Sequence, residues 1–589
     1  MRMRTVVFVL LIGLLMTPFC NLRADDESVF DRIRLEHEDI EKTLCGFCRV
    51  VSAHKAGILT SGQPISLQPI DVKHYRLQIS LDPDDATISG RVTVTAEATS
   101  ALSSVDLDAA DNLTIDSAST EAGPLQFRQR DGRVTIDLPG RLASGQQLSF
   151  AVEYHGAAAV IGRLGSGMLI QSHENRLVMA NLSEPFGAPT WWPCIDDPRD
   201  KATIDVEATV PPGYVVASNG LLRNTVANAD QTVTYYWQEQ NPLATYLVSV
   251  AATNYERFDD SYTALDGVTQ MPLVYYVYPE HLALAKEKFA FTRRAIEIFA
   301  GLFGEYPFLN EKYGMAEFPW NGAMEHQTMT SMGERIVGSA TSTGQLTIAH
   351  ELAHQWWGDL VTMKTWDDIW LNEGFATYSE VLFVEHFLDL DPGEVMSRSY
   401  DDGQIFGALG GTVTAENRDD PFDDRGGIYT KGGWVLHMLR HLVGDEKFFR
   451  ALKDYRARHE FGNGSTSELR ESFERQYGQS LDWFFQQWVY APGRPLYKLS
   501  SELKGPDGSG SYSVKVTLKQ KQSIAIPGRA EAVFIMPLDL TIHFDDGTTE
   551  THVVLNDARK QKVIFAVSKR PISVGVDEAH WVLKKVKGQ

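Results

Sequence analysis

Two histidines four residues apart, with a glutamate directly after the first, give this sequence its clearest chemical signal. His350, Glu351 and His354 lie in the segment IAHELAHQWWGD. On a helix, residues four apart share one face and lie about one turn apart, so both imidazoles can reach one metal ion. Glu351 can then lie beside the open position of that metal. The pattern is typical of a zinc-binding site.

A catalytic zinc usually has three protein ligands and one water, so the two histidines require a third donor nearby. The segment WLNEGFA supplies Glu373, 19 residues after His354. This interval leaves room for a turn and a second helix that returns the carboxylate to the metal. Glu380 lies on the same helix face as Glu373 and could orient a metal ligand or form a surface salt bridge. We therefore expect one Zn²⁺ per chain, held by His350, His354 and Glu373.

The elements that must position these residues follow from changes of hydrophobic period along the chain. Over residues 65–265, apolar positions alternate with period two between turn signals, which predicts a large N-terminal β domain. Over 266–495 they recur three and four residues apart, which predicts an α-helical catalytic domain. Short alternating segments return over 496–589 and predict a C-terminal β-sandwich. The predicted fold class is therefore multidomain α+β, with the metal site in the central domain.

Composition narrows the range of partners. The chain has 589 residues, of which 43% are hydrophobic and 22% charged, enough material for several ordinary globular cores. Its formal net charge of −22 repels phosphate backbones, so nucleic acid is not an expected partner. Beyond the N-terminal segment, no stretch is long and apolar enough to span a bilayer, so no stable membrane insertion is expected. The sequence leaves the oligomeric state open.

The N-terminus resembles an export signal. Within residues 1–24, two arginines precede an apolar run over 6–16 and then polar residues, as in a secretory signal peptide. We expect its removal and an exported, periplasmic or extracellular mature protein. Residues 25–64 are predicted to form a helical leader of unassigned role. Cys45 and Cys48 within it have redox or metal spacing, but a lone pair of this kind is a weak signal.

Four separated motifs, HELAHQWWGDLVT, WLNEGFATY, GAMEH and YTKG, resemble in order and spacing the zinc aminopeptidases of the aminopeptidase N and leukotriene-hydrolase family. The segment WPCIDDP and the domain order extend the likeness over about residues 65–589. The resemblance implies a thermolysin-like catalytic domain, a zinc cofactor and peptide substrates with a free N-terminus.

The resemblance also implies roles for single residues. The zinc ligands would be the same trio as above, Glu351 the general base, and Tyr429 a hydrogen-bond donor to the oxyanion. Glu325 would bind the substrate's α-ammonium, with Glu184 as a second anchor. His326 stands where the family often has Asn, which affects the fine positioning of the amine. The substrate-binding residues implied are Glu184, Gly322, Ala323, Met324 and Glu325.

An exported monozinc aminopeptidase is the function that the sequence predicts. Two buried carboxylates without a cation are costly, and a free α-ammonium would compensate them. An endopeptidase or an epoxide hydrolase would keep the metal and change the substrate. A binding ectodomain with an idle zinc site is the alternative that is not an enzyme. One aromatic cluster is expected to pack the core rather than line a pocket: Trp356, Trp357, Trp366 and Trp370.

Overall fold

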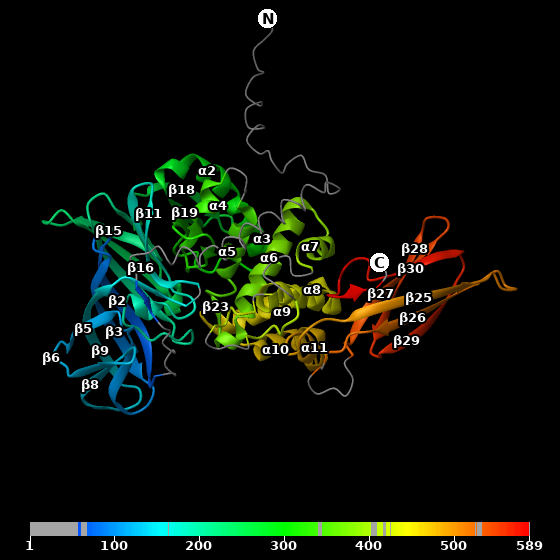
Figure 1. The fold of residues 1–589 in the computed structure, drawn as a ribbon, viewed down its shortest axis with the longest axis horizontal. Helices are drawn as coiled ribbons and strands as arrows, with labels where there is room; N and C mark the ends of the chain where they lie inside the picture. The colour runs from blue at the N-terminus through cyan, green and yellow to red at the C-terminus, as the bar shows by residue number, and fades with distance from the viewer. Residues whose placement is uncertain are drawn as a thin grey trace, which may run out of the picture.

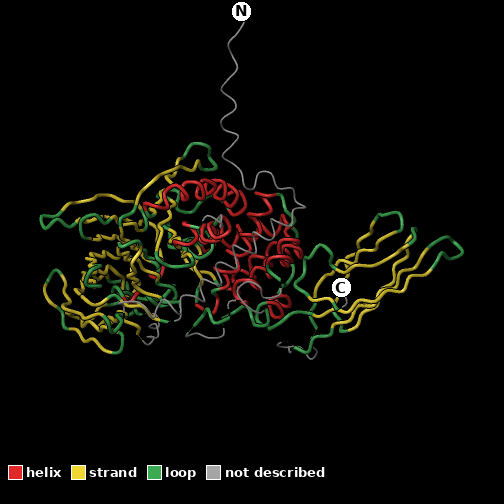
Figure 2. Tube along the Cα trace, turned by 45° about the horizontal axis from the view of Figure 1, so that its top comes forward, coloured by secondary structure: helices red, strands yellow, loops and turns green. Residues whose placement is uncertain are grey.

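The computed structural model describes residues 57–59, 68–162, 164–339, 344–401, 409–415, 420–424, 426–524, 526 and 533–587. The predicted signal peptide, most of the predicted leader and the Cys45/Cys48 pair lie outside these ranges. Within them, strands occupy the two ends of an elongated molecule and helices its middle (Figure 1, Figure 2). This arrangement confirms the predicted fold class.

An eight-stranded sheet forms the outer part of the N-terminal region, in the order β15-β16-β13-β2-β3-β9-β5-β6. Its long central strands β2 (Ile70–Asp82) and β3 (Thr87–Ala98) pair antiparallel, and buried and more exposed positions largely alternate along both. This is the period-two pattern of a sheet with one face toward a core. The other strands are β5 (Leu113–Thr120), β6 (Gly123–Pro124), β9 (Gln147–Ala157), β13 (Ala202–Val210), β15 (Leu221–Ala227) and β16 (Val233–Leu243).

A second N-terminal sheet leads toward the centre of the molecule. Its order is β1-β10-β11-β12-β17-β14, and its hairpin β11 (Ser166–His173) and β12 (Arg176–Leu182) ends two residues before Glu184. The remaining strands of this sheet are β1 (Gly57–Leu59), β10 (Ala159–Ile161), β14 (Val215–Ser218) and β17 (Val250–Thr253). A smaller three-stranded sheet contains β4 (Leu102–Asp108), β7 (Phe127–Arg130) and β8 (Arg133–Leu142).

The central region is mainly helical, as the sequence predicted, but it opens with a mixed five-stranded sheet that the sequence pattern did not indicate. All six residues of β20 (Tyr313–Phe318) are buried, so the strand lacks the alternation by which a half-exposed strand is recognised. The other strands are β18 (Glu256–Thr263), β19 (Gln270–Val277), β21 (Ala323–Met324) and β22 (Thr330–Gly333). The short β21 belongs to the GAMEH segment.

The helices of the central region pack beside this sheet. Two of them, α5 (Gln345–His354) and α6 (Trp370–Leu388), carry the HELAH and WLNEG motifs, and α8 (Gly432–Val443) packs on α6. The four tryptophans of the predicted aromatic cluster are all buried, as expected. The remaining helices are α2 (Leu282–Lys288), α3 (Thr292–Phe303), α4 (Glu334–Gly338), α7 (Pro392–Ser399), α9 (Asp445–His459), α10 (Thr466–Tyr477) and α11 (Asp482–Trp488). Strands β23 (Val361–Met363) and β24 (Gly462–Gly464) pair beside them.

A two-sheet β region closes the chain at the opposite end of the molecule from the N-terminal sheets (Figure 1). Alternate residues of β26 (Tyr512–Gln520) and β27 (Met536–Phe544) are buried, as the sequence pattern predicted for a sandwich. The other strands are β25 (Leu496–Lys504), β28 (Thr549–Asn556), β29 (Lys560–Val567), β30 (Pro571–Val576) and β31 (Lys585–Val586). Among the described residues, no helix has the length and apolar character needed to cross a bilayer.

Candidate metal centre and active site

The three predicted metal ligands converge. His350 and His354 lie on the last turn and a half of α5, Glu373 lies in the first turn of α6, and all three are buried. Glu373 Oε2 is 3.4 Å from His350 Nε2 and 3.6 Å from His354 Nε2. Ligands about 2.0–2.1 Å from one tetrahedral zinc lie about 3.3 Å from each other, so this spacing fits the ion. The two imidazoles lower the pKa of Glu373 to about 2, although burial opposes its ionisation.

The remaining ring nitrogens of both histidines are held by other groups. His350 Nδ1 donates to Glu380 Oε1 at 2.7 Å, and His354 Nδ1 donates to the Trp357 carbonyl oxygen at 3.1 Å. Because the acceptors are a carboxylate and a carbonyl, both Nδ1 atoms carry the proton, and both Nε2 lone pairs face the metal position. The Tyr400 hydroxyl donates to Glu380 Oε2 at 2.8 Å. Of the two roles open to Glu380, the structure has the orienting one.

Close helix packing sets the position of Tyr429. A Cβ on Gly374, the residue after the glutamate ligand, would lie only 2.9 Å from the Gly432 Cα, so α6 and α8 approach closely at a pair of glycines. Directly before α8, the chain forms one π-helical segment, η7 (Gly426–Lys431). Such segments often occur at functional sites. From η7 the ring of Tyr429 stacks over His350, with centroids 6.1 Å apart and planes 19° apart.

A pocket of about 760 Å³, which includes its open mouth, contains every residue of the predicted site. Glu351 points into it from α5, one residue after the first histidine ligand. Burial raises the pKa of Glu351 to about 8. The apolar part of the wall comes from both the N-terminal and central regions, and includes Leu164, Leu182, Trp320, Met324 and Phe422. The predicted site residues in its lining are Glu184, Gly322, Ala323, Met324, Glu325, His350, Glu351, His354, Glu373 and Tyr429.

Two carboxylates beside the metal position each keep one oxygen without a hydrogen-bond partner. Glu184 and Glu325 are 6% and 3% exposed, and neither Oε1 atom has a hydrogen-bond partner among the described residues. Carboxylate oxygens of Glu184, Glu325 and Glu373 lie within 4.8 Å of one another. Burial raises the pKa of Glu184 well above its usual range, and its charged neighbour Glu325 raises it further. Burial likewise raises the pKa of Glu325. The site therefore presents acids in excess over cations to whatever enters the pocket.

His326 lies outside the pocket lining. It is fully buried, and its Nδ1 is 2.8 Å from the Ser331 hydroxyl. Burial lowers its pKa to about 3, so the ring is neutral. The side chain that differs from the family's frequent Asn is thus part of the packing beneath Glu325 in this structure.

The residues that hold the Glu325 segment were not predicted from the sequence. Thr328 has a φ of 62°, which is uncommon for a β-branched residue. Its hydroxyl donates to Glu239 Oε2 at 2.9 Å and accepts from the Gly220 amide at 2.8 Å. Gln355, next to the second histidine ligand, accepts from the Thr328 amide at 3.0 Å and donates to the Glu325 carbonyl at 3.4 Å. These groups are far apart in sequence, and no local pattern marks them.

Comparisons with known proteins agree with the motifs. The peptidase M1 N-terminal domain model matches residues 71–247, and the peptidase family M1 domain model matches residues 288–488. A leucyl aminopeptidase of Saccharolobus solfataricus is 27% identical over 527 residues, which cover 86% of this chain and 62% of the relative. The chain spans 58% of the length of two further relatives.

Solved structures that resemble this chain include M1 zinc metallopeptidases. An M1 zinc metallopeptidase of Deinococcus radiodurans has a TM-score of 0.64 and 28% identity, over 73% of this chain and 95% of its own. Aminopeptidase A of Legionella pneumophila, solved in complex with aspartic acid, has a TM-score of 0.73 over 89% of this chain and 60% of its own. At 19% identity, the second likeness concerns the fold alone. From its two matched domains and its motifs, the chain belongs to the peptidase M1 family.

Proposed function

We propose that this protein is a zinc-dependent aminopeptidase that removes the N-terminal residue from peptides. The observation that carries the proposal is a pair of buried carboxylates beside the predicted metal trio, Glu184 and Glu325, each with one oxygen that has no hydrogen-bond partner among the described residues. Two uncompensated buried charges cost several kcal/mol, and the α-ammonium of a peptide would offset that cost. An internal peptide bond brings no cation to this position.

The chain's own residues then have defined tasks. When bound by His350, His354 and Glu373, Zn²⁺ supplies a water of lowered pKa and polarises the scissile carbonyl. Glu351 accepts the water's proton and passes it to the leaving amine. The Tyr429 hydroxyl donates a hydrogen bond to the carbonyl oxygen as negative charge develops there. Glu184 and Glu325 fix the N-terminus so that only the first peptide bond is aligned.

Related proteins support a peptide substrate. The Deinococcus radiodurans M1 zinc metallopeptidase has been solved, as a mutant, bound to a Tyr-Ser-Ala substrate. A two-domain M1 zinc metallopeptidase mutant has been solved with L-tryptophan and with L-arginine. Several relatives are named aminopeptidases. These names describe the relatives, and they support the proposal because this chain has the same peptidase family M1 domain.

The direct test compares an aminoacyl anilide that has a free amine with its N-acetyl form. We expect the free-amine substrate to be cleaved and the acetylated one to react at least ~10²-fold more slowly, because each ~1.4 kcal/mol of lost ammonium binding is tenfold. A chelator should stop the reaction and added zinc should restore it. Equal turnover of both forms would favour an endopeptidase. Hydrolysis of an epoxide but of neither anilide would favour an epoxide hydrolase. No hydrolysis at all would favour a binding domain with an idle zinc site.

We also propose that the protein is exported. The support is the arginine-led apolar segment within residues 1–24. Expression of the full chain followed by cell fractionation and N-terminal sequencing should find a protein outside the cytoplasm that begins near residue 25. An uncleaved chain in the cytoplasmic fraction would contradict this.

A further inference from the structure

The turn over residues 326–329 joins Glu325 to β22, and all four of its residues are buried. The Met329 amide donates to the His326 carbonyl at 3.0 Å and closes the turn. Thr328, at the third position, has the φ of 62° that a β-branched residue rarely adopts. Such a conformation persists only where the surrounding contacts hold it, and it is common at functional sites. The contacts of this turn therefore show what it is held against.

The N-terminal region holds the turn from one side. The Thr328 hydroxyl donates to Glu239 Oε2 of β16 at 2.9 Å and accepts from the Gly220 backbone amide at 2.8 Å. The Asn219 side-chain amide donates to the Gln327 carbonyl at 2.6 Å. Glu239 is only 1% exposed, so little solvent competes for its hydrogen bond with Thr328. These contacts fix the turn against the N-terminal sheets.

The helix that carries two of the three predicted metal ligands holds the turn from the other side. Gln355 directly follows His354, and its Oε1 accepts from the Thr328 amide at 3.0 Å and from the Tyr306 hydroxyl at 3.0 Å. Its Nε2 donates to the Glu325 carbonyl at 3.4 Å. One side chain next to a metal ligand thus contacts both the Glu325 backbone and the turn that follows it. The place of Glu325 relative to the metal position depends on this side chain.

We propose that Thr328 and Gln355 are positioning residues, which set the place of the Glu325 carboxylate and thereby the selectivity for a free amine. The inference rests on the proposed function. Neither residue belongs to the described pocket lining, so both act through Glu325 rather than on the substrate. Glu325 Oε1 has no hydrogen-bond partner among the described residues, so the backbone contacts of its segment fix where the carboxylate lies.

Thr328→Val tests this, because valine keeps the β-branched shape and loses the hydroxyl. A misplacement of 1 Å can cost about 10²-fold, so kcat/KM for a free-amine anilide should fall about 10–10²-fold. For the N-acetyl form it should not change, since that substrate brings no ammonium to Glu325. Thr328→Ser should restore the wild-type ratio of the two, and Gln355→Met should lower it. Elemental analysis should find unchanged zinc in all three variants, because the ligand trio is intact.

A double variant shows whether Thr328 acts through Glu325. Substitutions that act through one group are not additive, whereas independent effects add. Thr328→Val combined with Glu325→Gln should therefore have the same ratio as Glu325→Gln alone. A further loss in the double variant would overturn the positioning role. If Thr328→Val does not fold, Gln355→Met and its combination with Glu325→Gln make the same comparison.

Thr466→Val is the matched control. The Thr466 hydroxyl also donates to a carboxylate, Asp368 Oδ1 at 2.6 Å, and accepts from an N–H, the Trp370 indole at 2.9 Å, and the residue is 2% exposed. Its loss should lower stability in urea much as Thr328→Val does and leave the ratio unchanged. A wild-type-like ratio in Thr328→Val, beside a high ratio in the wild type, would overturn this inference alone. A wild-type ratio near one would overturn the proposed function and this inference with it.

Discussion

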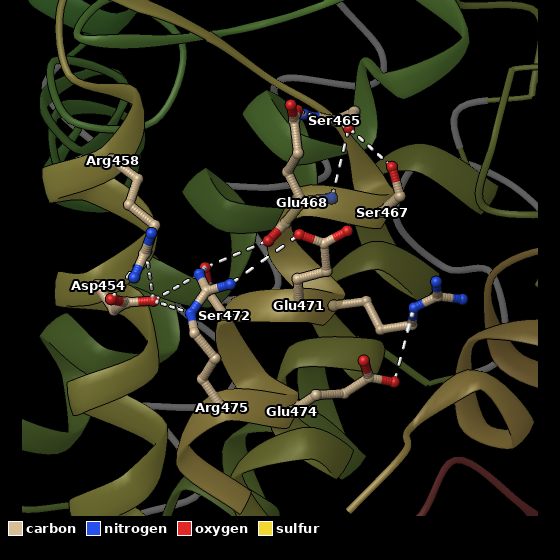
Figure 3. A network of polar contacts seen from close by, with 10 residues as sticks. Asp454, Arg458, Ser465, Ser467, Glu468, Glu471, Ser472, Glu474 and Arg475 are labelled. Carbon is tan, nitrogen blue, oxygen red and sulfur yellow. Dashed lines mark hydrogen bonds and ion pairs between the residues drawn. The ribbon is translucent and has the colours of Figure 1, made fainter.

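Two polar networks of this protein differ in what surrounds their charges. In the active site, Glu184 and Glu325 are buried and keep unpartnered oxygens. Between α9 and α10, Asp454 accepts from Arg458 at 3.0 Å and from Arg475 at 2.6 Å, near the solvent (Figure 3). At the start of α10 in the same view, a serine and a glutamate close a reciprocal capping box: Ser465 and Glu468.

The network between α9 and α10 contributes to stability, whereas the active-site carboxylates serve function. Solvated ion pairs such as those of Asp454 contribute about 0–1 kcal/mol each, and here they join two helices. Buried unpaired carboxylates destabilise the fold, so a chain that keeps them has another use for them. Substitutions in the active site should therefore reduce turnover more than stability. Substitutions between α9 and α10 should do the reverse.

The largest effect is expected for Glu351→Gln. The amide keeps the shape of the side chain but cannot accept the water's proton, so kcat should fall by about 10²–10⁴-fold. Zinc content should be unchanged, because Glu351 does not belong to the ligand trio. Steady-state kinetics and elemental analysis on the same sample check both statements. A variant as active as the wild type would refute the base assignment.

Tyr429→Phe should cost somewhat less. It removes one hydrogen-bond donor to the developing oxyanion, a loss that typically lowers kcat about 10²–10³-fold. KM should change little, because the donor acts mainly in the transition state. Tyr400→Phe is a matched control, since this tyrosine contacts Glu380 behind the ligands, and its effect should be smaller. A KM effect alone would show that Tyr429 only helps to bind substrate.

Glu325→Gln and Glu184→Gln should separate turnover from stability most clearly. Each should lower kcat/KM for a free-amine substrate, while the free energy of unfolding stays the same or rises by about 1 kcal/mol, because a buried charge is removed. Urea denaturation of the zinc-loaded proteins measures the free energy of unfolding. Marked destabilisation by either variant would mean that the carboxylate has a structural partner after all.

The smallest effect belongs to Asp454→Asn. At neutral pH it should cost less than about 1 kcal/mol of stability and leave kcat/KM unchanged. Burial opposes ionisation of Asp454, but hydrogen bonds from Arg475 and Arg458 outweigh it and lower its pKa. A lowered folded-state pKa stabilises above the unfolded value, and this contribution disappears as pH falls through the lowered one. The stability difference between variant and wild type should therefore shrink in acid.

Sequence patterns predicted the parts of this molecule that are local. The ligand spacing on α5 follows from helix geometry, and strands such as β2 show their alternation directly. The buried strand β20 shows none, because both of its faces are covered, and a helical centre was predicted where a sheet begins. The orienting role of Glu380 needed the structure, since sequence spacing also allowed a salt bridge.

Long-range contacts account for the rest. Thr328 is held by Glu239 and Gln355, which lie 89 and 27 residues away. His173, at the end of β11, likewise contacts Glu280 of the short helix η4 (Pro279–His281) and Glu334 of α4, segments that only the folded chain brings together. Neither group of contacts has a local sequence pattern.

The selectivity for a free amine tests the central claim most directly. The ratio of kcat/KM for a free-amine anilide over its N-acetyl form should be measured for wild type, Glu184→Gln, Glu325→Gln and the double variant. We predict a ratio of at least ~10² in the wild type, a lower one in each single variant and a value near one in the double variant. A high ratio that survives the loss of both carboxylates would contradict the account.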